Sequence, residues 1–240
     1  MKKEFNWGDT KEVTKNQITG EIFDRRCYEE LFQVQKGDIV MDIGASIGPF
    51  TWSIMDKASK VYTIEPMEEL QPLLRENTIN QSSNVEIIQK IISYEDGVCE
   101  NFNDGCFVHN DTNVRNVDSF TLKTFLQERN LNKIDFLKFD CEGGEYNLFT
   151  PSNINFLTNN VRNLVGEFHL NNVKINLTGD YSTNGVSYFR HFRDVYLPLF
   201  KQVEVRSFDG VDIKWDLYNE HFLEYYNEVV IHLSNEEPNK

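Results

Sequence analysis

Five short apolar runs divide the first 170 residues of this chain and constrain its fold more than any other feature. They lie at 39–43 (IVMDI), 60–64 (KVYTI), 85–88 (VEII), 134–139 (IDFLKF) and 163–168 (NLVGEF). Helix-like segments separate or flank them at 24–33, where Asp24 is a suitable N-cap, and at 48–58, 67–78, 121–130 and 143–158, the last broken near Pro151. Strands that alternate with helices predict a parallel sheet with helices on both faces.

The last third of the chain has a different pattern. A helix is predicted at about 186–197, and two strand-like runs follow within 201–210 (KQVEVRSFDG) and 227–234 (NEVVIHLS). No clear helical crossover separates these two runs, so they predict an antiparallel pair that closes the sheet edge. The expected fold is α/β, with a mostly parallel seven-stranded sheet. Residues 1–23 are expected to form an N-terminal extension, and residues 24–240 a single domain.

Charge and hydropathy exclude several classes of partner. The 240 residues include 24 basic and 38 acidic side chains, a net charge of −14, which disfavours nucleic acid and anionic membrane surfaces. No segment approaches the roughly 20 apolar residues of a membrane span, and the N-terminus lacks the apolar stretch of a signal peptide. Cysteines 27, 99, 106 and 141 have no C-x-x-C spacing. They predict reduced thiols in a cytoplasmic protein.

A glycine loop follows the first strand-like run, in the segment VMDIGASIGPFT at 40–51. Gly44 and Gly48 bracket a tight turn into a helix, where free N–H groups and a close backbone suit a bound ligand. A dinucleotide loop would read G-x-G-x-x-G, but here those positions hold Gly44, Ser46 and Pro49. The sequence from Asp42 to Gly48 reads D-x-G-x-x-x-G instead. This pattern resembles the first motif of class I S-adenosylmethionine-dependent methyltransferases.

An acidic residue follows the second strand-like run. The segment VYTIEP places Glu65 twenty-one residues after Gly44, where a carboxylate can accept hydrogen bonds from both ribose hydroxyls of a nucleoside. The loop and the acid together predict S-adenosylmethionine as the cofactor. Segment 89–97 (QKIISYEDG) is expected to supply the adenine contacts. The predicted cofactor-binding residues are Asp42, Gly44, Ala45, Ser46, Gly48, Glu65 and Asp140.

Four segments in order resemble the FkbM-type methyltransferase family: GDIVMDIGASIGPFT, VYTIEPMEE, IDFLKFDCEGGEY and GEFH. The resemblance covers about residues 25–170, and DCEGGEY is its most diagnostic part. It implies a Rossmann-like class I methyltransferase fold and an activity similar to the O-methyltransferases of natural-product and sugar pathways. The chain departs from the family at Ser46, where Asn is usual, and in VDSFTLKTFLQ, which lacks the usual Leu-Asp pair.

Acidic and imidazole side chains follow the fourth and fifth strand-like runs. Asp140 and Glu142 alternate at one strand end, and Glu167 and His169 at the next, so each pair is predicted to face one cleft. Methyl transfer requires alignment of the reacting groups and, for a hydroxyl acceptor, a base. The predicted catalytic residues are Asp140, Glu142 and His169. His169 is the natural candidate for the base, because imidazole titrates near neutrality, with the acids as alternatives, and Asp140 can also orient the amino group of the cofactor.

The residues around these groups allow two interpretations each. Glu145 either belongs to the site or complements the first turn of a helix, and Cys141 favours a core position over a nucleophilic role. Lys138 either pairs with an acid or extends to solvent. A divalent metal on Asp140, Glu167 and His169 is an alternative, but the Asp-Asn pair of catechol-type methyltransferases is absent, so no metal is expected. His109, His191, His221 and His232 are interpreted as structural.

The resulting functional prediction is a methyltransferase that methylates an oxygen of a sugar or another small hydroxyl-bearing acceptor. N- or C-methylation is one alternative. A second is a catalytically silent module that binds the cofactor and acts through partners. The segments VYLPLF and YNEHFLEYY, at 195–200 and 218–226, could form a homodimer or partner surface.

Overall fold

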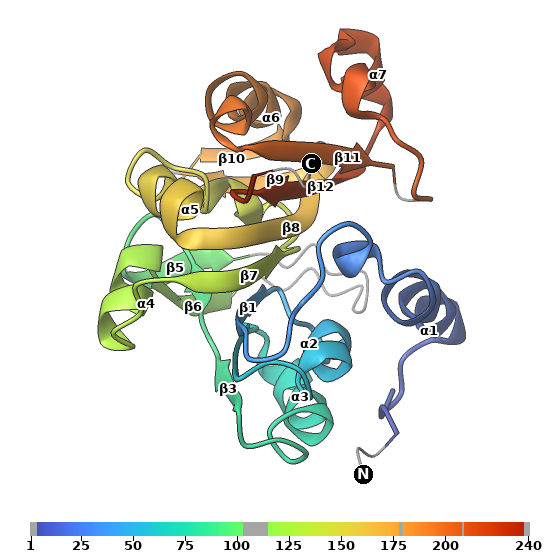
Figure 1. The fold of residues 1–240 in the computed structure, drawn as a ribbon, viewed down its shortest axis with the longest axis vertical. Coiled ribbons are helices and arrows are strands. Elements are labelled where there is room, and N and C mark those ends of the chain that lie inside the picture. The colour runs from blue at the N-terminus through green and yellow to red at the C-terminus, as the bar shows by residue number, and fades with distance from the viewer. Residues whose placement is uncertain (1–3, 103–114, 178–179, 208, 238–240) are drawn as a thin grey trace.

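The computed structural model of the chain describes residues 4–102, 115–177, 180–207 and 209–237, shown as coloured ribbon in Figure 1. Cys106 and His109 lie outside them. A seven-stranded sheet forms the centre of the fold, in the order β11-β12-β8-β7-β1-β2-β3. The strands are β1 (Ile39–Ile43), β2 (Lys60–Ile64), β3 (Val85–Ile88), β7 (Ile134–Phe139), β8 (Val161–His169), β11 (Gln202–Arg206) and β12 (Glu228–Ser234).

The direction of these strands confirms the predicted mixed sheet. Neighbouring strands from β3 to β8 are parallel, and β12 pairs antiparallel with both β8 and β11. The last strand of the chain is therefore inserted between two earlier ones, and β11 forms the edge. The predicted antiparallel pair of β11 and β12 is confirmed. The later strand, β12, lies next to β8 inside the sheet, and the earlier strand, β11, lies at the edge.

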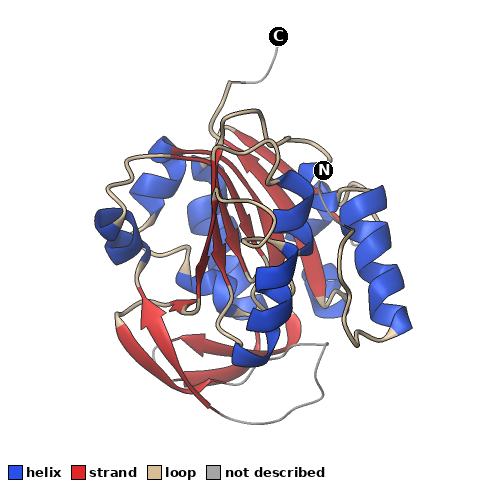
Figure 2. Ribbon diagram, turned by 90° about the horizontal axis from the view of Figure 1, so that it is seen from below, coloured by secondary structure: helices blue, strands red, loops and turns tan. Residues whose placement is uncertain are grey.

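Two hydrophobic clusters lie on opposite faces of the sheet, because adjacent strand residues point to opposite sides. Met41 and Leu137 belong to one cluster, and their chain neighbours Val40 and Phe136 belong to the other. The first cluster packs under α4 (Leu122–Glu128), α5 (Ile154–Asn160) and α6 (Val186–His191), and the second under α2 (Pro49–Ile54). Figure 2 shows the large sheet passing between helices on both sides.

The predicted helices are mostly present but shorter than their sequence patterns. The segment 67–78 forms a 3-10 turn at Glu68–Leu70 followed by α3 (Gln71–Asn77), and 186–197 forms α6 followed by a π-helical turn at Phe192–Tyr196. The segment 143–158 divides, as predicted, into a 3-10 turn at Gly144–Asn147 and α5. α7 (Glu220–Tyr225) completes the helices near the chain end.

The predicted helix over 24–33 is wrong. Asp24 ends a π-helix at Thr19–Asp24, Arg26 has a left-handed backbone with φ of 56°, and a 3-10 turn follows at Cys27–Glu29. Glu29 is buried, pairs with Arg26 and with Lys57 at 3.3 Å, and accepts a hydrogen bond from the backbone of Val34. Local polar contacts and an ion pair with Lys57 therefore accompany an irregular backbone in place of the regular helix that the local pattern favours.

Two small sheets accompany the main one and were missed by the apolar pattern. β4 (Ile91–Ile92), β5 (Gly97–Phe102) and β6 (Arg115–Phe120) form one, and β9 (Asn171–Leu177) and β10 (Asp180–Asn184) form the other. Their strands are short or largely polar in sequence, so they lack the continuous apolar run of a buried parallel strand.

The N-terminal segment packs closely on the rest of the chain. It contains α1 (Glu12–Ile18), and its Phe5 and Phe23 rings contact Trp52 of α2 with centroids 5.7 and 5.4 Å apart. The backbone N–H and C=O of Asn6 both bond to the Asn77 side chain, at 2.8 and 2.9 Å. None of the helices in the described ranges is long and apolar enough to cross a membrane.

Candidate active site

The glycine loop lies directly against the end of β7. Gly44 has φ of 74°, and a Cβ at this position would lie 1.7 Å from the carbonyl oxygen of Asp140. Gly48 has φ of 88°, and its Cβ would lie 2.8 Å from Leu74 in α3. The backbone N–H groups of Gly44 and Ala45 both donate to the carbonyl oxygen of Ile64, at 3.0 and 3.1 Å. The loop is thus fixed between β2, β7 and α3.

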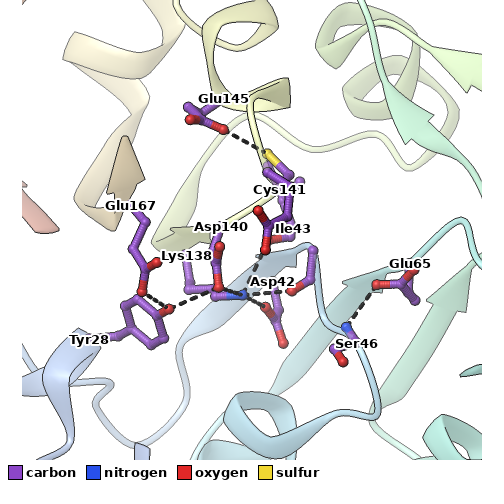
Figure 3. A network of polar contacts seen from close by, with 12 residues as sticks. Tyr28, Asp42, Ile43, Ser46, Glu65, Lys138, Asp140, Cys141, Glu145 and Glu167 are labelled. Carbon is purple, nitrogen blue, oxygen red and sulfur yellow. Dashed lines mark hydrogen bonds and ion pairs between the residues drawn. The ribbon is translucent and has the colours of Figure 1, made fainter. Parts of the chain in front are cut away.

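Glu65 reaches this loop from the end of β2. Its Oε2 accepts a hydrogen bond from the backbone N–H of Ser46 at 2.8 Å (Figure 3), and its Oε1 accepts one from the backbone N–H of Met67 at 2.9 Å. The residue is 5% exposed. Burial raises the pKa of Glu65 to about 7, although the two backbone bonds favour the carboxylate. The acid and the loop, predicted to act together, are in direct contact.

Lys138 provides a buried positive charge under the loop, as Figure 3 shows. Its Nζ donates to the carbonyl oxygen of Gly44 at 2.7 Å and lies 3.3 Å from Asp42 and 3.8 Å from Asp140. Burial alone would lower the pKa of Lys138, but the charges of Asp42 and Asp140 raise it. Lys138 therefore stays protonated and pairs with acids. Asp42, fully buried, also accepts a hydrogen bond from Thr51 at 2.7 Å.

The hydroxyl of Tyr28 joins two acids at the strand ends. It lies 3.0 Å from Asp140 Oδ2 and 2.6 Å from Glu167 Oε1. A single hydroxyl proton can serve only one carboxylate, so a protonated Glu167 completes the arrangement by donating to the Tyr28 oxygen. Burial and the Asp140 charge raise the pKa of Glu167 well above its ordinary value, which supports this.

His169 ends β8 and is held between two glutamates. Its Nδ1 lies 3.0 Å from Glu145 Oε1, which also accepts the backbone N–H of His169 at 2.7 Å, and its Nε2 lies 3.4 Å from Glu142. Burial would lower the pKa of His169, but the charges of Glu145 and Glu142 raise it well above its ordinary value. The imidazole is therefore protonated at neutral pH.

Glu145 makes this arrangement rigid. It is fully buried, and its Oε2 accepts a hydrogen bond from the backbone N–H of Gly143 at 2.9 Å. One carboxylate thus joins the turn after β7 to the end of β8. Of the two interpretations of Glu145, the contacts favour a role in the site, since its other oxygen orients the ring of His169. Cys141 is half-buried and packs beside the first hydrophobic cluster.

The structure brings the three predicted catalytic residues together. One carboxylate oxygen each from Asp140 and Glu142 and one imidazole nitrogen of His169 all lie within 4.8 Å of one another. The backbone conformation that brings them together differs from the predicted alternation along a strand. β7 ends at Phe139, and Glu142 has a left-handed backbone with φ of 50°. A tight turn, rather than a continuing strand, directs Glu142 back to His169. Burial raises the pKa of Glu142 to about 7.

A further acid that the sequence patterns did not identify lies beside His169. Glu228, the first residue of β12, pairs in register with His169 of β8. One carboxylate oxygen each from Glu167 and Glu228 and one imidazole nitrogen of His169 lie within 4.8 Å of one another. Burial raises the pKa of Glu21, in the π-helix Thr19–Asp24, to about 7, and the charges of Asp140 and Glu228 add to the shift. Spacings of this kind are compatible with a divalent cation. The combination considered as an alternative metal site, Asp140 with Glu167 and His169, is divided between two such groups.

Tyr28, Glu21 and Glu228 come from segments that carry no recognisable motif. Tyr28 falls in the stretch that was predicted as a regular helix, and Glu228 is the polar first residue of a terminal strand. Only the packing of the N-terminal segment and the insertion of β12 bring these side chains to the site, so a local pattern could not have shown them.

A comparison with protein-family models matches residues 42–204 to the methyltransferase FkbM domain. A search of curated proteins gives no match. Among solved structures, a methyltransferase FkbM from Methylobacillus flagellatus superposes with a TM-score of 0.52 and 14% sequence identity over 90% of this chain. This chain spans 47% of that protein's length.

A second similar structure has nearly the same size as this chain. It is assigned as an S-adenosylmethionine-dependent methyltransferase from Listeria monocytogenes, with a TM-score of 0.50 and 10% identity over 92% of this chain and 99% of that one. Both structures share the α/β architecture with the mostly parallel sheet, and at these identities the likeness concerns the fold.

Proposed function

Since the chain belongs to the FkbM methyltransferase family, whose model covers residues 42–204, we propose that it uses S-adenosylmethionine to methylate a hydroxyl group. The proposed acceptor is a sugar or another small hydroxyl-bearing molecule. The observation that carries this proposal is the contact between the glycine loop and Glu65, beside a separate group of acids around His169.

The residues of the loop fit the cofactor. Gly44 lets the loop pack against the backbone of Asp140, and Ala45, Ser46 and Gly48 continue a turn that would suit the amino-acid end of S-adenosylmethionine. Glu65 would accept hydrogen bonds from the ribose hydroxyls, since each of its oxygens uses one acceptor position in the contacts described above. Asp42 shapes the loop through Lys138, and Asp140 would bind the amino group. When bound, S-adenosylmethionine supplies a methyl carbon that leaves sulfur as the acceptor oxygen bonds to it.

Glu142 is the group best suited to accept the proton of the acceptor hydroxyl. Its pKa of about 7 leaves much of it ionised at neutral pH, and its side chain is 31% exposed. His169 is already protonated between Glu145 and Glu142, so it would orient Glu142 and stabilise its charge. Asp140, bonded to Tyr28, would position the acceptor. The three predicted catalytic residues thus have distinct proposed roles.

The cofactor proposal is tested by calorimetric titration with S-adenosylhomocysteine, NAD and NADP. We expect only S-adenosylhomocysteine to bind, and we expect Glu65→Ala to weaken it at least tenfold, because two charge-assisted hydrogen bonds are each worth roughly 1.5–3 kcal/mol. Circular dichroism checks that the variant is folded, since Glu65 also supports Ser46 and Met67. Binding of NAD, or unchanged affinity in the variant, contradicts the assignment.

The chemical step is tested by the pH dependence of methyl transfer to a panel of sugars and glycolipids. We expect the rate to rise as Glu142 ionises through about pH 7 and to fall at higher pH as His169 loses its proton. Glu142→Gln should lower turnover by roughly 10²- to 10⁴-fold, remove the acidic limb and leave S-adenosylhomocysteine affinity nearly unchanged. An unaltered acidic limb would assign the proton transfer to another group. Cofactor binding with no transfer to any acceptor would support the silent module.

A further inference from the structure

A buried amide side chain fixes the turn that connects β2 to α3. Gln71 is the first residue of α3 and is 6% exposed. Its Nε2 donates to the carbonyl oxygen of Glu65 at 2.7 Å and to that of Met67 at 3.2 Å. An amide nitrogen has two N–H donors, so both are used on the backbone that follows β2. The function proposed above assigns no role to this side chain.

The amide of Gln71 serves the turn through its donors alone. Carbonyl oxygens only accept hydrogen bonds, so the side chain must present its nitrogen to them. Its Oε1 is buried and, within the part of the chain that the structure describes, accepts no hydrogen bond. A side chain of the same size without N–H donors would therefore fill the same space and leave both carbonyl groups without this partner.

The turn held by Gln71 in turn holds the carboxylate of Glu65. The backbone N–H of Met67 donates to Glu65 Oε1 at 2.9 Å, while the carbonyl of the same residue accepts from Gln71. The Met67 side chain is 3% exposed and forms a small hydrophobic cluster with Leu70 and with Ile47 of the glycine loop. Met67 is thus fixed on three sides, and its N–H fixes one oxygen of Glu65.

The direction of the Glu65 carboxylate matters because two adjacent hydroxyls of a ribose need two correctly directed acceptor positions. Ser46 holds one oxygen of Glu65 and Met67 holds the other, and each oxygen keeps an acceptor position for a ligand. Binding groups depend on supporting hydrogen bonds that lock their geometry. Loss of the Gln71 donors would release Met67, and with it the orientation of Glu65 Oε1.

We propose that Gln71 is a positioning residue, which acts through Met67 and Glu65 and makes the site select nucleosides that carry both ribose hydroxyls. This inference rests on the proposed function, since it assumes that Glu65 binds the ribose of S-adenosylmethionine. It assigns the selectivity for ribose over deoxyribose to the connection between β2 and α3 as well as to Glu65.

The test measures by calorimetry the affinities of S-adenosylhomocysteine and of its 2′-deoxy and 3′-deoxy analogues. We expect the unmodified protein to bind S-adenosylhomocysteine at least tenfold more tightly than either analogue. In Gln71→Met, which keeps the length of the side chain but has no N–H donor, the ratio should fall below threefold. Gln71→Glu, which keeps its shape, should give the same decrease. A merely structural role would weaken all three ligands equally and leave the ratio unchanged.

Asn84→Leu is the matched control. The Asn84 amide also donates to two carbonyl oxygens, those of Met55 and Ala58, at 2.8 and 2.7 Å. Asn84 precedes β3, which runs parallel to β2, so it lies at the sheet edge opposite to Glu65. This variant loses two buried hydrogen bonds in the same way and should keep the tenfold ratio. Melting temperatures check that all variants are folded.

A double-mutant cycle shows whether Gln71 acts through Glu65. In protein that already carries Glu65→Ala, adding Gln71→Met should change S-adenosylhomocysteine affinity by less than twofold. A larger additional loss, or a ratio that stays above threefold in Gln71→Met, overturns the inference. If the unmodified protein binds S-adenosylhomocysteine without preference for its hydroxyls, the ribose contact of Glu65 and the inference both fail, while cofactor binding stands. Absence of S-adenosylhomocysteine binding would contradict the proposed function itself.

Discussion

Gly44 shows how a single position determines the site. Its backbone is left-handed, and the space that a side chain would need is filled by the carbonyl oxygen of Asp140. Gly37 also has a left-handed backbone, with φ of 93°, but nothing lies within 4 Å of its missing Cβ. Substituting alanine at each glycine therefore distinguishes the cost of a left-handed backbone from the cost of steric overlap.

We expect Gly44→Ala to unfold at a clearly lower temperature than Gly37→Ala and to lose S-adenosylhomocysteine binding. Both variants carry the cost of a left-handed alanine, about 1–2 kcal/mol, but only Gly44→Ala must also displace Asp140 from the loop. Calorimetry of unfolding and of ligand binding measures both effects. Equal stability and affinity of the two variants would show that the loop and β7 are less tightly packed than described.

The sequence identified part of this site at the residue scale. The period-two spacing of 140, 142, 167 and 169 predicted a group of acids with an imidazole, and the structure brings Asp140, Glu142 and His169 together. The left-handed turn at Glu142 was not predictable, since glycine is the usual residue for such a conformation. The roles of Tyr28 and Glu228 depend on contacts over more than 100 and 50 residues of chain, which no local pattern records.

Between elements, Asn77 joins the N-terminal segment to the glycine loop. Its fully buried side chain donates to the carbonyl oxygens of Asn6 and Ile47, both at 2.9 Å, from the last turn of α3. The N-terminal segment and the loop therefore share one support.

Replacing Asn77 with alanine should weaken S-adenosylhomocysteine binding as well as stability. Loss of a buried hydrogen-bond partner costs about 1–3 kcal/mol, and here the affected carbonyl belongs to the loop. Asn84→Ala is the control, because the Asn84 amide also donates to two carbonyl oxygens, those of Met55 and Ala58, away from the loop. Thermal unfolding should show both variants destabilised, and titration should show weakened binding only for Asn77→Ala. If both variants bind S-adenosylhomocysteine with equal affinity, the contacts of Asn77 do not support cofactor binding by the glycine loop.

Element prediction succeeded where burial is continuous along the sequence. All six residues of β7 are buried, and its apolar run gave both boundaries. The segment 24–33 has helical spacing, but its buried Glu29 forms an ion pair with Lys57 of a distant segment. A polar contact between distant segments leaves no periodic signal, so a local pattern could not predict it.

For the whole molecule, the buried acids make stability depend on pH. The folded state holds protons on Glu65, Glu142, Glu167 and His169 more tightly than the unfolded chain does. This stabilisation is complete below the unfolded pKa values and is lost as pH rises through the folded ones. His232, whose pKa burial lowers to about 3, opposes the effect only below about pH 6.5.

The melting temperature should therefore fall steadily from pH 6.5 to 8.5, as the net charge of −14 also increases in magnitude. Scanning calorimetry at three pH values in this range measures the change. Glu65→Gln, which cannot ionise, should show a shallower decrease. A melting temperature that rises over this range would mean that the buried acids are already ionised in the folded protein.

The insertion of β12 between β8 and β11 has a consequence for biosynthesis. A ribosome completes both flanking strands before it makes β12, so a nascent chain that ends at β11 has unpaired edges on both strands. Exposed edges of this kind can pair with other chains. When β12 emerges, it closes the gap and brings Glu228 to the site in the same step. A truncated translation product would therefore be prone to aggregation and would lack the acid that lies beside His169.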